Sequence, residues 1–227
     1  MTDWMTKRRP YGKRQARMII DRLIGLYGLP ETTLDDKDDP WRLLVAAILA
    51  AQCTDERVNK VTPYLWEAYP TMEDISKAGP KAIEPIIKSC GLYRNKAKNI
   101  HLASLYLLEH HQGQVPETLE ALLEVPGVGR KIANLILGDS FGQEAIVVDT
   151  HCKRLSKRMG LTDADDPYKV EQDLVQKVPE EHWTDWGHLM VTHGRAVCMA
   201  RSPQCDACVV QDICREGRKV WRESQNK

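Results

Sequence analysis

A glycine-rich turn followed by a lysine is the segment of the chain that best fits a binding or catalytic site. The stretch Pro126-Gly127-Val128-Gly129-Arg130-Lys131 places two glycines within three residues, ahead of an apolar helical run. Because glycine has no side chain, its backbone N–H groups can approach an anion closely, and the next helix directs its positive end toward it. The turn therefore predicts a phosphate-binding backbone with an amine beside it.

Three kinds of phosphate site could contain such a turn. A P-loop requires Gly-x4-Gly-Lys-Ser/Thr, but Ile132 follows Lys131 and no glycine directly precedes it. A dinucleotide-binding turn requires a preceding strand, whereas Leu119–Val125 has a helical pattern. A helix–hairpin–helix remains, in which the glycines contact a DNA phosphate without reading base sequence. An ordinary turn between two helices is the alternative.

Lys131 and Asp149 are the two candidate catalytic residues. Lys131 falls in the first turn of the helix after the hairpin, where the positive end of the helix dipole disfavours an ammonium group. A neutral amine is a nucleophile that can form a Schiff base, although a surface lysine more commonly contacts phosphate. Asp149 follows a short apolar run and opens the next helix, so it is expected to cap that helix. The same carboxylate could stabilise positive charge that develops on a sugar ring.

The seven cysteines fall into two groups. Cys53, Cys90 and Cys152 are scattered in apolar or helical surroundings, where buried free thiols are expected. The other four form the pattern Cys198-x6-Cys205-x2-Cys208-x5-Cys214. Four thiolates in so short a segment indicate a metal centre in a reducing compartment, not disulfides. The spacing favours a [4Fe–4S] cluster and leaves zinc as the alternative, since zinc sites usually show two Cys-x2-Cys pairs.

Helical periodicity dominates the segments that must position these residues, and it predicts an all-α protein. A first helix carries Ile19 to Tyr27 and ends at Gly28-Leu29-Pro30, and Trp41–Gln52 is apolar all round, as a buried central helix would be. Residues 145–148 look strand-like but are too short to found a sheet. Further helices are expected over residues 58–69, 81–89, 97–111, 119–123, 130–137, 149–159, 167–176 and 184–197.

Composition bounds the class of protein. The 227 residues are 42% hydrophobic and 28% charged, with no apolar run of the roughly 20 residues that span a membrane. The first ten residues lack the apolar region of a secretory signal, so a cytoplasmic location is expected. Since the formal net charge is zero, a nucleic acid would be held by local basic patches. One candidate patch, which could equally be solvated surface, comprises Lys7, Arg8, Arg9, Lys13, Arg14 and Arg17.

The motifs together resemble the endonuclease III family of helix–hairpin–helix DNA glycosylases. The resemblance rests on Leu123–Lys131, on Val148-Asp149-Thr150-His151 and on the four-cysteine tail, and it covers roughly residues 39–216. Further matching segments are Ala51-Gln52-Cys53-Thr54-Asp55, Gly91-Leu92-Tyr93-Arg94-Asn95-Lys96-Ala97 and His193-Gly194-Arg195.

The resemblance implies a base-excision repair enzyme that removes oxidised pyrimidines and cleaves the resulting abasic site by β-elimination. Lys131 would attack C1′ of the damaged nucleotide and form a Schiff base, and Asp149 would assist it. The four cysteines would hold a [4Fe–4S] cluster. The residues expected to contact DNA are Gln52, Leu92, Gly127, Val128, Gly129, Arg130, His151 and Arg201. A monofunctional glycosylase and a non-catalytic helix–hairpin–helix DNA-binding module are the alternatives.

The same resemblance implies two helical domains with a DNA cleft between them. Residues 32–143 would form a six-helix domain with the hairpin, and residues 1–31 with 144–227 would form a second domain with the cluster. The expected partner is double-stranded DNA with damaged pyrimidines or abasic sites. The protein is expected to act as a monomer in the cytoplasm, associated with the nucleoid and not with a membrane.

One departure from the family pattern bears on DNA binding. Family members often carry several basic residues in the loop between the first two cluster cysteines. Here the loop reads Met-Ala-Arg-Ser-Pro-Gln, so Arg201 is its basic residue. A weaker phosphate contact is therefore expected from this loop, offset by the basic N-terminal segment.

Overall fold

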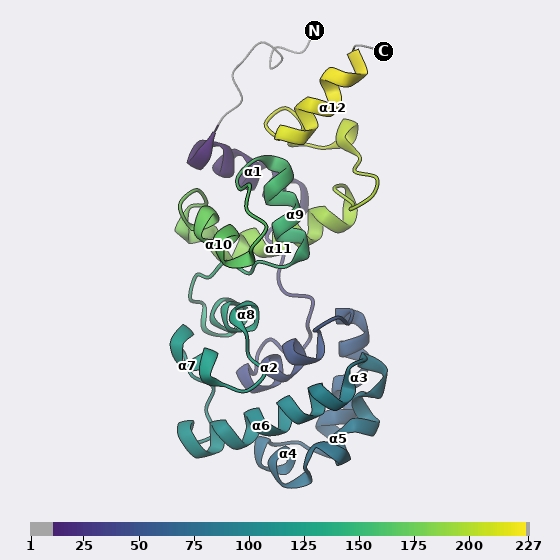
Figure 1. The fold of residues 1–227 in the computed structure, drawn as a ribbon, viewed down its shortest axis with the longest axis vertical. Coiled ribbons are helices and arrows are strands. Elements are labelled where there is room, and N and C mark those ends of the chain that lie inside the picture. The colour runs from purple at the N-terminus through teal and green to yellow at the C-terminus, as the bar shows by residue number, and fades with distance from the viewer. Residues whose placement is uncertain (1–10, 226–227) are drawn as a thin grey trace. The chain divides into compact units, whose positions relative to one another are not determined.

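The computed structural model describes residues 11–225, and all regular structure in that range is helical (Figure 1). The prediction of an all-α protein is confirmed. No helix in residues 11–225 combines the length and the apolar character that crossing a membrane requires. Lys7, Arg8 and Arg9 lie outside the described residues, as does the segment considered as a secretory signal.

The chain divides into two compact units. We call residues 32–143 the contiguous unit, and residues 1–31 with 144–227 the split unit.

The contiguous unit is built around α2, whose ten residues include eight that are buried. The Asp39 carboxylate caps this helix by accepting from the N–H groups of Trp41 and Arg42. Helix α8 packs on α2, while α4 and α5 lie along α6 (Figure 1). The helices are α2 (Pro40–Leu49), α3 (Asp55–Ala68), α4 (Met72–Ala78), α5 (Pro80–Ile87), the 3-10 helix η2 (Lys88–Cys90), α6 (Tyr93–His111), α7 (Leu119–Glu124) and α8 (Arg130–Phe141).

The expectation of six helices in this unit is wrong, because residues 32–143 contain seven α-helices. The helix that periodicity missed is α4, which has seven residues and thus too few turns to show a repeating apolar face. Its start is nevertheless marked in the sequence. The Thr71 hydroxyl accepts from the Asp74 N–H at 3.2 Å, and the Asp74 carboxylate accepts from the Thr71 N–H at 3.1 Å, which is a capping box.

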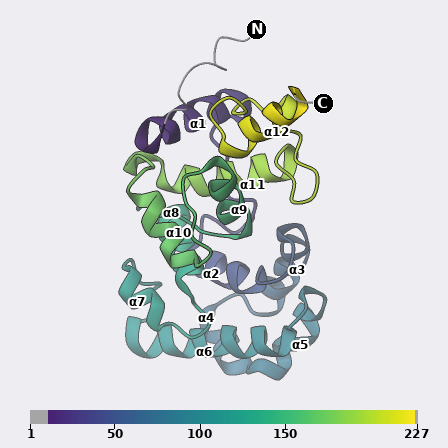
Figure 2. The ribbon, with the colours of Figure 1, turned by 45° about the horizontal axis from the view of Figure 1, so that its top comes forward.

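The split unit joins the first helix of the chain to the C-terminal half. Ile19, Ile20 and Leu23 of α1 are fully buried in one core with Leu155 and Trp186. Figure 2 shows α1, α9 and α11 in this unit. The helices are α1 (Gly12–Tyr27), α9 (Thr150–Met159), α10 (Pro167–Val175), the 3-10 helix η3 (Glu180–His182), α11 (Trp183–Ala196), the 3-10 helix η4 (Cys205–Ala207) and α12 (Arg215–Gln225).

Two details of the split unit differ from expectation. Residues 145–148 form no strand, and α12 was not predicted. The Val147 backbone lies against Gly187 of α11, where an added Cβ would come 3.5 Å from the Val147 carbonyl oxygen. The apolar run is therefore a packed connector. Helix α12 is strongly charged, and its large apolar residues, Val220 and Trp221, are too few to show a helical repeat.

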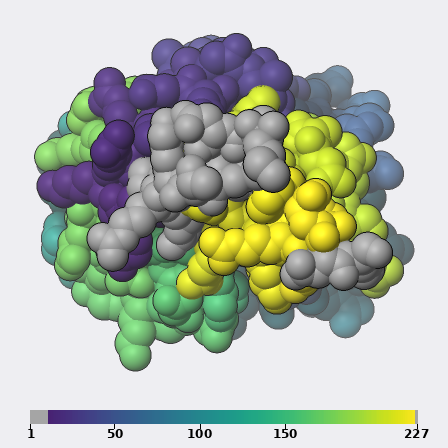
Figure 3. Space-filling model, turned by 90° about the horizontal axis from the view of Figure 1, so that it is seen from above, coloured from purple at the N-terminus to yellow at the C-terminus, as the bar shows by residue number. Residues whose placement is uncertain are grey.

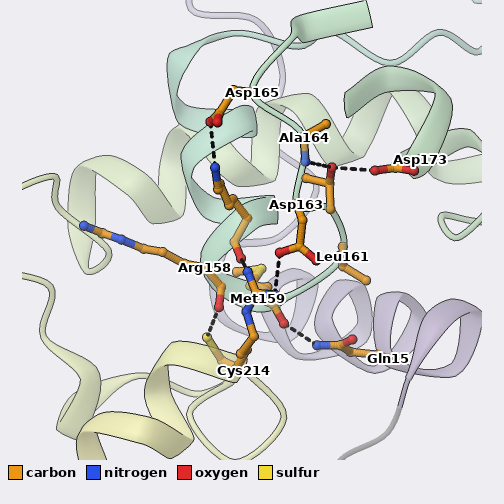
Figure 4. Close-up of polar contacts among 12 residues, drawn as sticks. Gln15, Arg158, Met159, Leu161, Asp163, Ala164, Asp165, Asp173 and Cys214 are labelled. Carbon is orange, nitrogen blue, oxygen red and sulfur yellow. Dashed lines mark hydrogen bonds and ion pairs between the residues drawn. The ribbon is translucent and has the colours of Figure 1, made fainter. Parts of the chain in front are cut away.

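A buried glutamine fastens α1 to the rest of the split unit. The Gln15 side chain is fully buried, and its amide donates to the carbonyl of Met159 at 2.7 Å (Figure 4) and to that of Ile213 at 2.8 Å. Arg22 forms an ion pair with Asp212 on the same segment. Figure 3 shows the surfaces of α1 and of the C-terminal segment on one face of this unit.

Replacing Gln15 with alanine should destabilise the protein by about 1–3 kcal/mol, because two buried carbonyls lose their donor. Urea unfolding of the purified protein measures this change. Gln172→Ala, at an exposed position of α10, is the matched control and should change stability by less than about 0.5 kcal/mol. Equal stability of Gln15→Ala and the control would contradict the assigned role of Gln15.

Candidate functional site

The glycine turn is a hairpin between two helices, as predicted. Gly127 has a φ of +83°, and a Cβ there would lie 2.7 Å from the Cβ of Asn99 on α6. Both the left-handed backbone and the close packing therefore require glycine. Val128 is buried and anchors the turn, and its N–H donates to the Val125 carbonyl at 3.0 Å.

The next helix begins directly beyond the hairpin. Gly129 is the N-cap of α8 and provides no side chain to cap it. A Cβ at Gly129 would meet no atom within 4 Å beyond its chain neighbours, so the space beside this residue is open. An N-terminus of this kind suits an anion such as a phosphate.

Lys131 is exposed in the first turn of α8. The Ala133 N–H donates to the Gly129 carbonyl at 3.0 Å, which forms the helical turn that contains Lys131. The amine therefore projects from a rigid helix immediately behind the hairpin. This arrangement places an amine next to the backbone of the hairpin.

Asp149 caps α9, which confirms that part of its expected role. Its Oδ1 accepts from the N–H of Cys152 at 2.7 Å, and the residue is half-buried. Cys152 is fully buried, and burial, with a smaller contribution from Asp149, raises the pKa of its thiol to about 12. The buried thiol at Cys152 agrees with the sequence prediction.

His151 lies where α9 packs on α11. A Cβ on Gly194 would come within 2.5 Å of its Nδ1, and Arg154 Nη2 lies 3.3 Å from the same nitrogen. Arg154 also donates to the carbonyl of Cys198 at 3.1 Å. His151 is thus held in a fixed position by two helices.

Gln52 and Leu92 share an unusual backbone conformation. Their φ values are +53° and +46°, in the left-handed region that non-glycine residues rarely occupy. Both side chains are exposed, Leu92 by 53%. Gln52 was expected at the end of a helix, but α2 ends at Leu49 and Gln52 lies in the turn that follows. Such conformations cost about 1–3 kcal/mol each and concentrate at functional sites.

The four clustered cysteines surround a single cavity. Cys198 follows α11, Cys205 and Cys208 begin and follow η4, and Cys214 precedes α12. No three His, Cys, Asp or Glu side chains in residues 11–225 are arranged to hold one metal ion. The four cysteines line one cavity, as the ligands of a multi-iron cluster do.

Hydrogen-bond donors and burial at this cavity fit a cluster of iron and sulfur. Arg158 Nη1 donates to Cys198 Sγ and the Gly217 N–H donates to Cys214 Sγ, each at 3.4 Å. Burial, with a smaller contribution from the neighbouring thiols, raises the pKa of Cys208 and of Cys214 to about 11. Four thiolates that line one cavity require a cationic partner, and the iron of a cluster would supply it.

His193 is a residue near the cluster site that sequence reasoning did not single out. It is fully buried, with Nε2 3.4 Å from Cys208 Sγ and Nδ1 2.9 Å from the Tyr27 hydroxyl. Burial lowers the pKa of His193 to about 4, so the ring is neutral at physiological pH. The segment His193-Gly194-Arg195 matched the family pattern in the sequence. The contact between His193 and Tyr27 of α1 could not be read from the sequence, because it forms only in the folded protein.

Comparison with known proteins identifies the family. The model for HhH-GPD superfamily base excision DNA repair proteins matches residues 45–180, and that for the iron–sulfur binding domain of endonuclease III matches residues 198–214. Endonuclease III of Synechocystis sp. is 46% identical over 89% of this chain and 92% of its own length. Endonuclease III of Escherichia coli K12 is 40% identical over 92% of this chain and 98% of its own.

A solved structure agrees with these relatives. The structure of a trapped endonuclease III–DNA covalent intermediate has a TM-score of 0.87 and 41% identity, and it covers 94% of this chain and 100% of its own. A thermostable thymine-DNA glycosylase, at 22% identity and a TM-score of 0.81, shares the fold. The hairpin, the four-cysteine cavity and these matches lead to one conclusion: the chain belongs to the endonuclease III family of base excision DNA repair proteins.

Proposed function

We propose that Lys131 and Asp149 perform the chemistry of this DNA glycosylase and abasic-site lyase. The observation that carries the proposal is the exposed amine of Lys131 in the first turn of α8, directly behind the uncapped glycine hairpin. A solved relative at 41% identity is described as a trapped covalent intermediate with DNA. A covalent intermediate requires a nucleophile, and Lys131 is a nucleophile that the hairpin would bring to the DNA backbone.

The reaction begins with attack of the neutral Lys131 Nζ on C1′ of the damaged nucleotide. The bond from C1′ to the base breaks, and the base leaves with the bonding electron pair. The ring oxygen then departs from C1′ with proton transfer, which leaves a Schiff base between Lys131 and the opened sugar. Loss of a proton from C2′ expels the 3′ phosphate, and water releases the lysine.

Asp149 supports the early part of this sequence. One of its oxygens caps α9, which fixes the carboxylate in position. Its negative charge would stabilise positive charge on the sugar as the base departs and would assist proton removal from Lys131.

The other predicted residues bind DNA in this proposal. The backbone of Gly127–Arg130 holds a phosphate, while Gln52 and Leu92 occupy the space that the flipped nucleotide leaves in the stack. Their exposure and left-handed backbones support this role. His151 and Arg201 provide further contacts with the DNA backbone.

The cofactor is a [4Fe–4S] cluster held by Cys198, Cys205, Cys208 and Cys214. When bound it crosslinks the segment between α11 and α12, which stabilises a part of the chain with few apolar residues. Glycosidic cleavage and β-elimination exchange no electrons with a cofactor. The contribution of these cysteines is therefore to shape the loop that carries Arg201.

Oxidised pyrimidines and abasic sites in double-stranded DNA are the proposed substrates. The protein would act as a monomer on nucleoid DNA in the cytoplasm. A monofunctional glycosylase would release bases without breaking the strand, and a DNA-binding module would do neither, so base release and strand cleavage measured together separate the three possibilities.

Borohydride should trap the wild-type protein on DNA that contains thymine glycol, and Lys131→Gln should abolish the adduct, because the amide cannot form an imine. Gel electrophoresis of the denatured complex measures trapping. Lys81→Gln removes a charge from another exposed site of the contiguous unit and should trap normally. A wild-type protein that cleaves DNA without a trapped adduct would overturn the proposed mechanism.

Asp149→Asn should slow single-turnover base release by roughly 10²- to 10⁴-fold while the helix cap persists, because asparagine caps as well as aspartate but carries no charge. Asp166→Asn is the matched control, since Asp166 caps α10 by accepting from the Lys169 N–H. Similar rates for the two variants would reduce Asp149 to a structural cap.

Arg201→Ala should reduce the slope of log K against log salt concentration for DNA binding by about one unit, because one phosphate contact is lost. Fluorescence anisotropy at several salt concentrations measures the slope. Arg222→Ala, at an exposed position of α12, should leave it unchanged. An unaltered slope in Arg201→Ala would remove Arg201 from the DNA interface.

A further inference from the structure

A buried lysine joins the two turns that carry Gln52 and Leu92. Lys96 lies in the first turn of α6 and is 3% exposed. Its Nζ donates to the Leu49 carbonyl at 2.8 Å and to the Cys90 carbonyl at 2.7 Å. Lysine is almost never fully buried unless its charge is compensated. The contacts of Lys96 therefore point to a specific role inside the contiguous unit.

Both acceptors are carbonyls at helix ends. Leu49 is the last residue of α2, and Cys90 is the last residue of η2. Carbonyls in the last turn of a helix have no partner within that helix and form the negative end of its dipole. One ammonium group thus satisfies carbonyls at the ends of two helices that are distant in sequence.

Each of these ends leads directly into a strained turn. Gln52 comes three residues after Leu49, and Leu92 two residues after Cys90. In residues 11–225 the non-glycine residues with positive φ are Gln52, Leu92 and Gln112, so two of the three adjoin carbonyls that Lys96 binds. The Lys96 N–H also donates to the Leu92 carbonyl at 3.1 Å. Strained conformations persist where surrounding contacts fix them, and Lys96 supplies such contacts to both turns.

The thiols of Cys53 and Cys90 also lie near this ammonium. Burial, with a smaller contribution from Cys53, raises the pKa of Cys90 to about 11. Cys90 is therefore a neutral thiol at physiological pH. Burial lowers the pKa of Lys96, and the nearby cysteines oppose that change. The carbonyl oxygens are the acceptors that compensate the buried ammonium.

We propose that Lys96 is a positioning residue that holds the Gln52 and Leu92 turns in the geometry needed to fill the gap left by a flipped nucleotide. The inference rests on the proposed function, because that function assigns the gap to Gln52 and Leu92. Lys96 itself is buried and acts through the two turns. Its contribution is confined to steps that open a base-paired duplex.

The test compares two substrates that differ in the need to fill a gap. Lys96→Met keeps the length of the side chain and removes the ammonium. It should slow single-turnover base release from a thymine-glycol duplex by about tenfold or more, equivalent to about 1.4 kcal/mol of transition-state stabilisation. Strand cleavage at a preformed abasic site in a single-stranded oligonucleotide has no stack to fill and should change less than about threefold.

Lys98→Met is the matched control. Lys98 is exposed on the same helix, so this variant removes the same charge without touching either turn. Both of its rates should match those of the wild type. Lys96→Gln, whose amide can donate to one carbonyl, should show an intermediate loss on the duplex and serves as the test if Lys96→Met fails to fold.

A double-mutant cycle separates positioning from general stability. In a Gln52→Ala/Leu92→Ala background, Lys96→Met should slow duplex base release by less than about twofold, because the groups through which it acts are gone. Equal losses on both substrates, or a full tenfold loss in this background, would overturn the proposal. Failure of the wild-type protein to form a borohydride adduct would instead refute the proposed function, which separates the two outcomes.

Discussion

Every α-helix leaves N–H groups at its start and carbonyls at its end without partners inside the helix, and the candidate site depends on how this chain satisfies them. At the start of α8 a glycine supplies no cap, which suits that end to an anion. At the start of α9 the Asp149 carboxylate supplies the cap. At the ends of α2 and η2 the Lys96 ammonium donates to the free carbonyls.

The same constraint explains why the site residues are scattered along the sequence. Within a helix the backbone N–H and carbonyl groups are paired with each other, so they cannot bind a ligand. Turns between helices offer unpaired groups and strained conformations that a ligand can use. Gln52, Leu92 and Gly127 all lie in such turns, and two of the cluster cysteines, Cys198 and Cys214, flank helix ends. The helices therefore form a rigid scaffold, and several candidate functional residues lie at helix ends and in the turns between helices.

Much of the fold could be predicted from the sequence, because long helices bury repeating apolar faces. The buried character of α2 and the hairpin before α8 both follow from residue type and spacing. Two helices escaped prediction, since α4 is too short for a repeat and α12 has too few apolar residues to show one. The capping pair Thr71 and Asp74 was a readable signal for α4.

The candidate site was predictable where a residue's role follows from its neighbours in sequence. The four cysteines and the Asp149 cap are of this kind. Lys96 is not, because a lysine between Asn95 and Ala97 gives no sign that it is buried. Its acceptor at Leu49 lies 47 residues away, and His193 likewise meets Tyr27 across 166 residues. Contacts between residues so far apart in the sequence form only when the chain folds, so local sequence patterns do not reveal them.

The split unit has a consequence for synthesis on the ribosome. Helix α1 emerges early, yet Ile19, Ile20 and Leu23 are buried against residues from Ile146 onward. With elongation at about 5–20 residues per second, these side chains wait roughly 6–25 seconds for their partners. The contiguous unit can fold during that interval, whereas the apolar face of α1 remains without the residues it packs against. Nascent-chain chaperones thus have a defined window, and a defined helix, on which to act.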